Sequence, residues 1–219
     1  MTNNSAILSK NPRVNDRIHE LLALLCTEDR KKFLRKFNSE DNEQSHHTFR
    51  ELLIGAYLLK NCLNARYDQV VQDKTPDWSV REESGELSGL VEQLTFHQAR
   101  ELDHAMNATL RAGQTWVGWV PSAAERIYQK VLSKAEVYEK LANSLSVPYI
   151  ITLFADFAAA VEIDEIHDAC LKLNGGGVFS AANHLSGVVF FEENKGKYEF
   201  QYIPNPHAPR PIYLVGATL

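Results

Sequence analysis

The sequence predicts an α/β fold in which a mixed central sheet is flanked by helices and preceded by a helical N-terminal extension. Amphipathic helical patterns alternate with short strand patterns along the chain. One apolar run of strand length, typical of the buried centre of a sheet, is "VPYIITLF" at 147–154. The expected order is helix, three strands, helices, strand, helix and a final hairpin in "SGVVFFEENKGKYEFQYI".

The N-terminal extension is predicted to contain two helices between residues 13 and 37. Apolar residues recur there at helical spacing, and Thr27 is a suitable N-cap for the second helix. The following stretch, "NSEDNEQSHHT" at 38–48, contains no large apolar residue, which indicates a polar linker. We therefore expect a helical extension over residues 1–45 and an α/β domain over residues 46–219.

The main domain is expected to begin with a buried helix, because "FRELLIGAYLLKNCL" is apolar on nearly all sides. Glu51 interrupts this apolar surface, and a buried carboxylate needs a cation or a network of hydrogen bonds. His46 and His47 precede the helix in the polar stretch and are interpreted as solvated, as are His97 and His104.

Three short strands should follow, and the last two form a hairpin; their sequences are "RYDQVV", "TPDWSVRE" and "GLVEQLTF". Asp77 lies in the first arm of this hairpin and Glu92 in the second, and paired positions of neighbouring strands lie within about 5 Å. Two carboxylates that close favour a cation between them, and hard oxygen ligands favour Mg²⁺ or Mn²⁺. Trp78 should point to the opposite face of the strand and pack in the core.

A long helix is predicted in the second half of the chain, after a helix at 97–112, with Ser122 and Glu125 as a capping box. One face carries residues at spacings of three and four: Ile127, Val131, Lys134, Tyr138, Leu141 and Leu145. Lys134 interrupts this apolar face, so its ammonium needs an acidic partner, and the hairpin carboxylates are candidates if the helix packs on the sheet.

Simpler interpretations exist for the same residues. Pro76 and Asp77 could form an ordinary turn, and Glu92 could pair with Lys134 in a structural ion pair. Tyr138 is expected to be a core aromatic residue. "NGGG" at 174–177 has no preceding strand and no following lysine, so it is interpreted as a helix stop and not as a phosphate loop.

Composition limits the classes of protein that the chain can belong to. It has 219 residues, of which 44% are hydrophobic, enough for one domain with an extension or one larger domain. The net charge of −5, from 23 basic and 28 acidic residues, argues against a broad basic surface for nucleic acid. The basic run "DRKKFLRKF" could contact phosphates locally or be the solvated face of a helix.

Other features predict a cytoplasmic protein without a membrane span. No apolar run is long enough to cross a bilayer, and the first residues lack the pattern of a secretory signal. Cys26, Cys62 and Cys170 lie far apart and are interpreted as ordinary thiols. Trp116 and Trp119 could form a stacking surface for bases or pack against the sheet.

Together these residues resemble the PD-(D/E)-X-K, or restriction-endonuclease-like, superfamily, of which this chain looks like a divergent member. The resemblance covers residues 46 to 219 and includes the order of the elements. A member has a helical Glu, a strand that opens with Pro-Asp, an acidic residue in the next strand, and a helix with a Lys and an aromatic residue one turn later. The matching positions are Glu51, Pro76, Asp77, Glu92, Lys134 and Tyr138. In one departure, Leu94 stands where the family has a lysine two residues after the acid, and Lys134 is the candidate replacement.

The resemblance implies metal-dependent hydrolysis of nucleic-acid phosphodiester bonds, with DNA the favoured substrate. Asp77 and Glu92 would hold Mg²⁺ or Mn²⁺, Glu51 would hold a second ion or orient the water molecules of the first, and Lys134 would stabilise charge on the phosphate. By analogy with the superfamily, such an enzyme would act in restriction, repair or defence against foreign DNA. Two alternatives are a catalytically inactive relative that acts as an interaction or assembly subunit, and a nucleic-acid-binding module without cleavage. A homodimer or a protein partner fits these possibilities.

Overall fold

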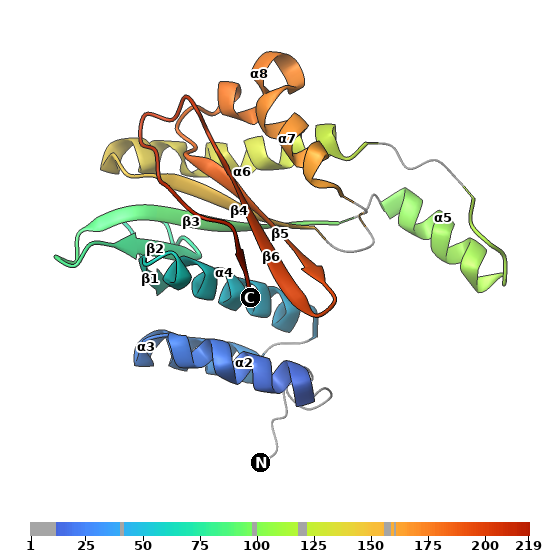
Figure 1. Cartoon of the computed structure of the whole chain (residues 1–219), viewed down its shortest axis with the longest axis horizontal. Coiled ribbons are helices and arrows are strands. Elements are labelled where there is room, and N and C mark those ends of the chain that lie inside the picture. The colour runs from blue at the N-terminus through green and yellow to red at the C-terminus, as the bar shows by residue number, and fades with distance from the viewer. Residues whose placement is uncertain (1–11, 40–41, 98–99, 118–121, 156–158, 160) are drawn as a thin grey trace. The chain divides into compact units, whose positions relative to one another are not determined.

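The computed structural model describes residues 12–39, 42–97, 100–117, 122–155, 159 and 161–219. The chain is an α/β protein, in which N-terminal helices are followed by a mixed seven-stranded sheet with helices packed on it (Figure 1); the strand order is β1-β2-β3-β4-β5-β6-β7. It divides into two compact units, residues 1–92 with Leu219 and residues 93–218. None of the helices in these ranges is both long and apolar enough to cross a membrane.

The first unit begins with three helices: α2 (Pro12–Leu24), α3 (Thr27–Ser39) and α4 (Asn42–Lys60). Helices α2 and α3 lie side by side against α4 (Figure 1). The two expected N-terminal helices are confirmed. The expected polar linker is wrong over residues 42–48, because these residues form the first turns of α4. The inward positions there include the small side chains of Ser45 and Thr48, which are buried without large apolar groups.

Three antiparallel strands complete the first unit: β1 (Asn64–Tyr67), β2 (Trp78–Arg81) and the first part of β3 (Leu87–Phe96). Trp78 pairs with Val91, which confirms the hairpin between β2 and β3. Strand β1 is shorter than "RYDQVV" suggested, because Asp68 has a φ of 49° and turns the chain out of the extended conformation.

Trp78 anchors the packing between this sheet and α4. Its side chain is fully buried, as expected, and its Nε1–H donates to the carbonyl oxygen of Glu51 at 2.9 Å. A Cβ atom on Gly55 of α4 would lie 2.2 Å from the indole ring, so only glycine fits there. Phe33 of α3 completes the cluster by stacking on Tyr67 of β1, with ring centroids 4.0 Å apart. This aromatic cluster fixes α3, α4, β1 and β2 to one another.

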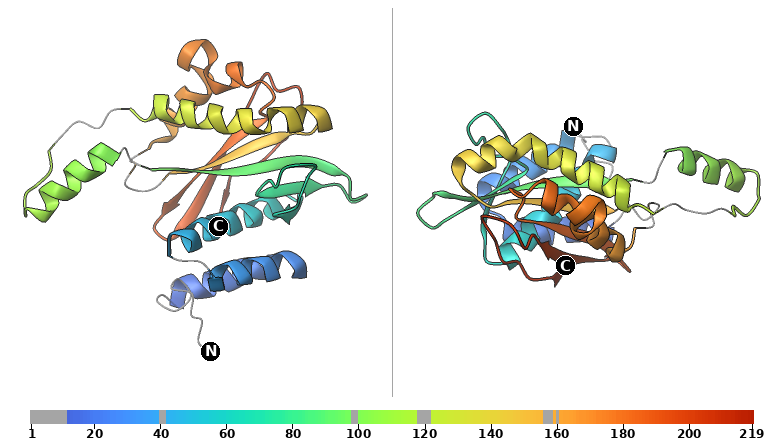
Figure 2. Two further views of the ribbon diagram at one scale, coloured as in Figure 1. Left: turned by 180° about the vertical axis from the view of Figure 1, so that it is seen from behind. Right: turned by 90° about the horizontal axis from the view of Figure 1, so that it is seen from above.

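The second unit contains the remaining elements, listed here in chain order: α5 (Arg100–Arg111), α6 (Ala124–Leu145), β4 (Tyr149–Ala155), α7 (Ile163–Leu171), α8 (Leu173–Ala181), β5 (Gly187–Asn194), β6 (Lys197–Pro204) and β7 (Ala217–Thr218). Strand β4 is parallel to β5, and β5, β6 and β7 continue antiparallel. Helix α6 lies along β4, with α7 and α8 beside it (Figure 2). Strand β4 is buried at every residue, which confirms the expected central strand, and the final hairpin is also present.

The start of α6 keeps part of the expected cap, because Oγ of Ser122 accepts a hydrogen bond from the N–H of Ala124 at 3.2 Å, whereas Oε1 of Glu125 accepts from Gln129. The N-cap of α6 is Ala123, without a side-chain cap, and the backbone N–H of Ala123 donates to Oε1 of Glu165 at 2.6 Å. The capping box instead forms at the start of α7, between Glu162 and Glu165. The carboxylate of Glu165, which is distant in sequence, therefore accepts a backbone N–H at the start of α6, as Glu125 was expected to do.

The glycine-rich stretch at 174–177, which lies within the range of α8, is a tight non-helical turn. Asn174, Gly175, Gly176 and Gly177 all have positive φ, which breaks the helix as expected. At Gly177 an added Cβ would lie 2.1 Å from the backbone of Cys170, so the chain passes too closely for any side chain.

The C-terminal segment of the second unit is held by hydrogen bonds between side chains and backbone. Asn205 donates through Nδ2 to the carbonyl of Leu185 at 2.7 Å, and Ser186 donates through Oγ to the carbonyl of Arg210 at 2.7 Å. The guanidinium of Arg210 donates to the carbonyl of Ala142 at 3.3 Å, near the C-terminal end of α6, where unpaired carbonyls need donors.

Candidate functional site: an acidic centre in the first unit

Asp77 is fixed through its backbone at the start of β2. The preceding Pro76 is buried and offers no N–H, and the carbonyl of Asp77 accepts a hydrogen bond from the N–H of Asp68 at 3.0 Å. The N–H of Asp77 donates to Oε1 of Glu92 at 3.1 Å. The hairpin register therefore brings Asp77 next to Glu92, although the hydrogen bond joins a carboxylate to a backbone amide.

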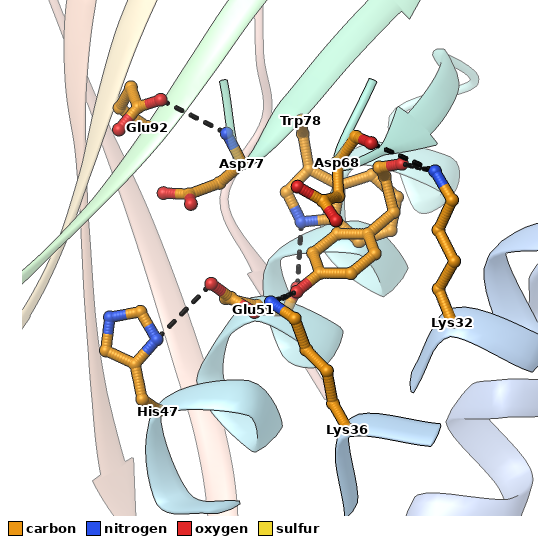
Figure 3. A network of polar contacts seen from close by, with 9 residues as sticks. Lys32, Lys36, His47, Glu51, Asp68, Asp77, Trp78 and Glu92 are labelled. Atoms are coloured by element: carbon orange, nitrogen blue, oxygen red, sulfur yellow. Dashed lines mark hydrogen bonds and ion pairs between the residues drawn. The ribbon is translucent and has the colours of Figure 1, made fainter. Parts of the chain in front are cut away.

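Glu92 and Glu51 are both buried carboxylates near this point. Glu92 is 3% exposed on β3, and Glu51 is 4% exposed on α4. The carboxylate of Asp77 lies in the same part of the first unit, half-buried (Figure 3). Three acidic side chains thus gather around the start of β2, which is the acidic centre discussed below.

Glu51 is surrounded by side-chain donors from β1, from α3 and from its own helix α4 (Figure 3). The hydroxyl of Tyr67 on β1 donates a short hydrogen bond to Oε2. The Nζ of Lys36 on α3 lies 3.5 Å from the same oxygen, and Nδ1 of His47 lies 3.3 Å from Oε1. The requirement that a buried Glu51 have cationic or hydrogen-bonding partners is therefore met within the first unit.

These contacts set the charge of Glu51. Burial on its own would raise the pKa of this carboxyl, but hydrogen bonds from His47 and Tyr67 and the charge of Lys36 outweigh burial, so the pKa is lowered. Burial, and then the neighbouring charge of Glu51, raise the pKa of the Tyr67 hydroxyl, which stays protonated and remains a donor. Glu51 is therefore an ionised carboxylate inside the protein.

His47 has the complementary shift. Its hydrogen bond to Glu51 raises its pKa, burial opposes this, and the negative charges of Glu51 and Asp77 raise it further. His47 therefore contacts Glu51 directly, and the charge of Asp77 also acts on its ring. The interpretation of His47 as a solvated linker residue is wrong, because the residue lies in α4 one turn before Glu51. His46, His97 and His104 are exposed, as expected.

The basic run of α3 is largely structural. Lys32 donates to the carbonyls of Tyr67 at 2.8 Å and Asp68 at 2.9 Å, and Lys36 donates to the Tyr67 hydroxyl at 2.5 Å. Arg30 donates to carbonyls at the end of α2. The interpretation of this run as a solvated helix face is correct for Lys31 and Arg35, which are exposed. Three of its cations instead attach α3 to its neighbours.

Sequence reasoning missed three members of this network: Lys36, His47 and Tyr67. The spacing of four residues between His47 and Glu51 was an available signal, because such pairs meet on one face of a helix. It was hidden because residues 38–48 were read as a linker. The contacts of Lys36 and Tyr67 depend on how α3 packs against β1, which no local pattern reports.

Lys134, Tyr138 and Leu94 belong to the second unit. Lys134 is half-buried on α6, and its carbonyl accepts a hydrogen bond from the Tyr149 hydroxyl at 3.4 Å. Tyr138 is a core residue, as expected, and stacks on Tyr149 with ring centroids 5.5 Å apart. The role of Lys134 at the acidic centre stays a prediction. Trp116 is half-buried, and Trp119 lies outside the described residues.

The acidic centre matches the ligand preferences of a divalent ion in part. Carboxylate oxygens are the ligands that Mg²⁺ and Mn²⁺ prefer, which suits Asp77 and Glu92. Glu51 suits an ion less well, because both of its oxygens already contact donors of the chain. Within the described ranges, no group of three or more His, Cys, Asp or Glu side chains is arranged to hold a metal ion. A pair of ligands, Asp77 and Glu92, is thus the part of the predicted set that fits best.

The fold and these side chains define an α/β protein with an acidic centre in its first unit. No protein-family model, curated protein or solved structure matches the chain.

Proposed function

We propose that this protein is a divalent-metal-dependent nuclease that hydrolyses phosphodiester bonds of nucleic acid, with DNA the favoured substrate. The observation that carries the proposal is the junction of β2 and β3, where Asp77 is bound through its backbone to the buried carboxylate of Glu92. Asp77 and Glu92 would hold Mg²⁺ or Mn²⁺. The resemblance to restriction-endonuclease-like proteins supports the same assignment.

A bound ion supplies two effects in such a site: it polarises the phosphate and lowers the pKa of a water molecule. The chain supplies the position of the carboxylates. Pro76 and the hydrogen bond from Asp68 restrain the backbone at Asp77, and burial restrains Glu92. Lys134 is the candidate to stabilise charge on the phosphate, as the resemblance to the superfamily implies.

The proposal is tested with the purified full chain, single-stranded and double-stranded DNA and RNA, and Mg²⁺ or Mn²⁺. Cleavage should be lost in Asp77→Asn and in Glu92→Gln. Asp73→Asn is the matched control, because Asp73 is an exposed acid in the turn before β2, and it should cleave like the unmodified protein. Isothermal titration with Mn²⁺ gives a second readout, in which binding should weaken in the first two variants only.

One observation favours a second candidate, a catalytically inactive relative that acts as an interaction or assembly subunit. Leu94 occupies the strand position at which the family has its lysine. If the unmodified protein cleaves no substrate and binds no Mn²⁺, the nuclease proposal is wrong and this alternative gains support.

A further inference from the structure

We infer that Glu51 and His47 form a pair in which the carboxylate orients the imidazole, and that His47 Nε2 contacts a phosphate group of the nucleic acid. This inference rests on the proposed function, since it takes nucleic acid as the ligand. It gives Glu51 a different role from the ligand role predicted for it. In this assignment His47 is a substrate-binding residue and Glu51 is a positioning residue.

The first step is the commitment of Glu51 to its own chain. Oε2 contacts Tyr67 and Lys36, and Oε1 contacts His47. A metal ion at Glu51 would have to compete with an ammonium and an imidazole for these oxygens. A buried carboxylate with such partners is instead well suited to hold one of them in a fixed orientation.

The second step is the direction of the imidazole ring. Nδ1 of His47 lies 3.3 Å from Glu51 Oε1, and the ring's other nitrogen, Nε2, points away from Glu51 (Figure 3). The hydrogen bond at Nδ1 leaves Nε2 for a second partner. The side chain of His47 is 45% exposed, so that a ligand can reach it, whereas Glu51 is buried.

The third step is the charge around the ring. Glu51 contacts Nδ1 of His47 at 3.3 Å, and a carboxylate on one ring nitrogen together with a phosphate on the other favours a ring that carries a hydrogen on both. Nε2–H is then a charged donor, and phosphate oxygens are strong acceptors for such donors. An acidic centre also repels phosphate, and a cation at its border reduces that repulsion. The chemistry of the pair therefore fits a phosphodiester next to the carboxylates.

His46 provides a matched control. It is the adjacent histidine in α4, is exposed, and is the same type of side chain one position earlier in the helix. Replacing His46 removes a histidine without touching Glu51. A difference between the two variants then reports the pair and not the general charge of the helix.

The experiment measures the Kd of fluorescein-labelled single-stranded and double-stranded DNA by anisotropy, with Mg²⁺ present. Asp77→Asn is the background, which prevents cleavage under the proposed function. Adding His47→Ala should raise the Kd about tenfold, as expected for one charge-assisted hydrogen bond, and adding His46→Ala should leave it unchanged. The slope of log Kd against the logarithm of the salt concentration should also decrease by about one, as expected for one lost phosphate contact, and only in the His47 variant.

Glu51→Gln tests the positioning role in the same background. It should weaken DNA binding as much as His47→Ala does, and the two changes together should weaken it no further, because they remove one interaction. Circular dichroism of each variant checks that the fold is retained, and Glu51→Asp provides a conservative variant that should restore part of the affinity.

The outcomes separate the two proposals. If the unmodified protein cleaves DNA but His47→Ala binds DNA like His46→Ala, the inference is wrong and the nuclease proposal stands. If no substrate is cleaved while the Kd still depends on His47, the inference stands and the nuclease proposal is wrong. If the unmodified protein binds neither single-stranded nor double-stranded DNA, the inference is overturned.

Discussion

Both units of the protein bury hydroxyl side chains, but they differ in the burial of carboxylates. Among the described residues, the buried carboxylates all lie in the first unit: Asp29, Glu51 and Glu92. The buried polar side chains of the second unit are amides, hydroxyls and one histidine: Gln93, Thr152, His184, Ser186 and Asn205.

The buried polar side chains of the two units also differ in their hydrogen-bond partners. Ser186 and Asn205 bond to backbone groups, and His184 lies 3.0 Å from the carbonyl of Ala135. Such bonds fix loops and cost little in desolvation. Glu51 bonds to charged or ionisable side chains, which costs more, because charges must leave water. Costly burial of charge is typical of functional sites, so the comparison directs attention to the first unit.

The largest expected effect concerns the packing that supports the acidic centre. Trp78→Ala should lower the free energy of unfolding by about 4 kcal/mol, because it removes a fully buried ring. Gly55→Ala should cost about 2 kcal/mol, since its Cβ would meet the ring at 2.2 Å. Urea unfolding of the full chain measures both changes. If both substitutions lower the free energy of unfolding by less than about 1 kcal/mol, the packing of Trp78 against α4 does not stabilise the first unit as we expect.

A second prediction compares the two units directly. Glu51→Ala should cost about 2 kcal/mol, because it leaves the buried Tyr67 hydroxyl without its acceptor. Asn205→Ala should cost about 1 kcal/mol, since it removes neutral hydrogen bonds only. Added salt should change the cost of the first substitution and not of the second. Equal costs with equal salt dependence would break the comparison.

The third prediction concerns pH. The lowered pKa of Glu51 contributes stability above its ordinary value of about 4.3, and this is lost as pH falls through the folded value. The raised pKa of His47 contributes stability below its ordinary value of about 6.5, and this is lost as pH rises through the folded value. The pair is therefore most stabilising between about pH 4.3 and 6.5.

This pH effect should be small, below about 1 kcal/mol, because His47 is half-exposed and solvent screens it. Melting temperatures measured from pH 5 to pH 8 test it, with His47→Ala compared with His46→Ala. The loss of stability above pH 6.5 should shrink in the His47 variant alone. If both variants show the same dependence of melting temperature on pH, the pair of His47 and Glu51 is not the source of the pH effect.

The smallest expected effect separates the cations of α3. Lys32→Met should cost about 1 kcal/mol, because Lys32 bonds to the carbonyls of Tyr67 and Asp68. Lys31→Met is its neighbour on the exposed face and should be nearly neutral. Thermal unfolding of both variants provides the measurement, and equal melting temperatures would show that α3 is attached by apolar packing alone.

Much of the fold could be predicted because it follows from local patterns. Helical periodicity located α2, α3 and α6, and an uninterrupted apolar run located β4. The hairpin turn fixed the register that brings Asp77 next to Glu92.

The parts that could not be predicted depend on contacts distant in sequence. Glu165 supplies an acceptor for the N–H of Ala123 42 residues earlier, which local capping rules do not reveal. Lys36 reaches Tyr67 across 31 residues, and this contact depends on how two packed elements are rotated. His47 was the exception, because its spacing to Glu51 was visible once the stretch was known to be helical.

The attachment of α3 has a consequence for shortened forms of the protein. Without α3, Tyr67 loses both the aromatic ring stacked on it and the ammonium beside its hydroxyl. Large rings would then face water, which favours aggregation. A truncated protein that starts at α4 is therefore expected to aggregate. The amino-terminal helices should be retained whenever the chain is shortened for expression.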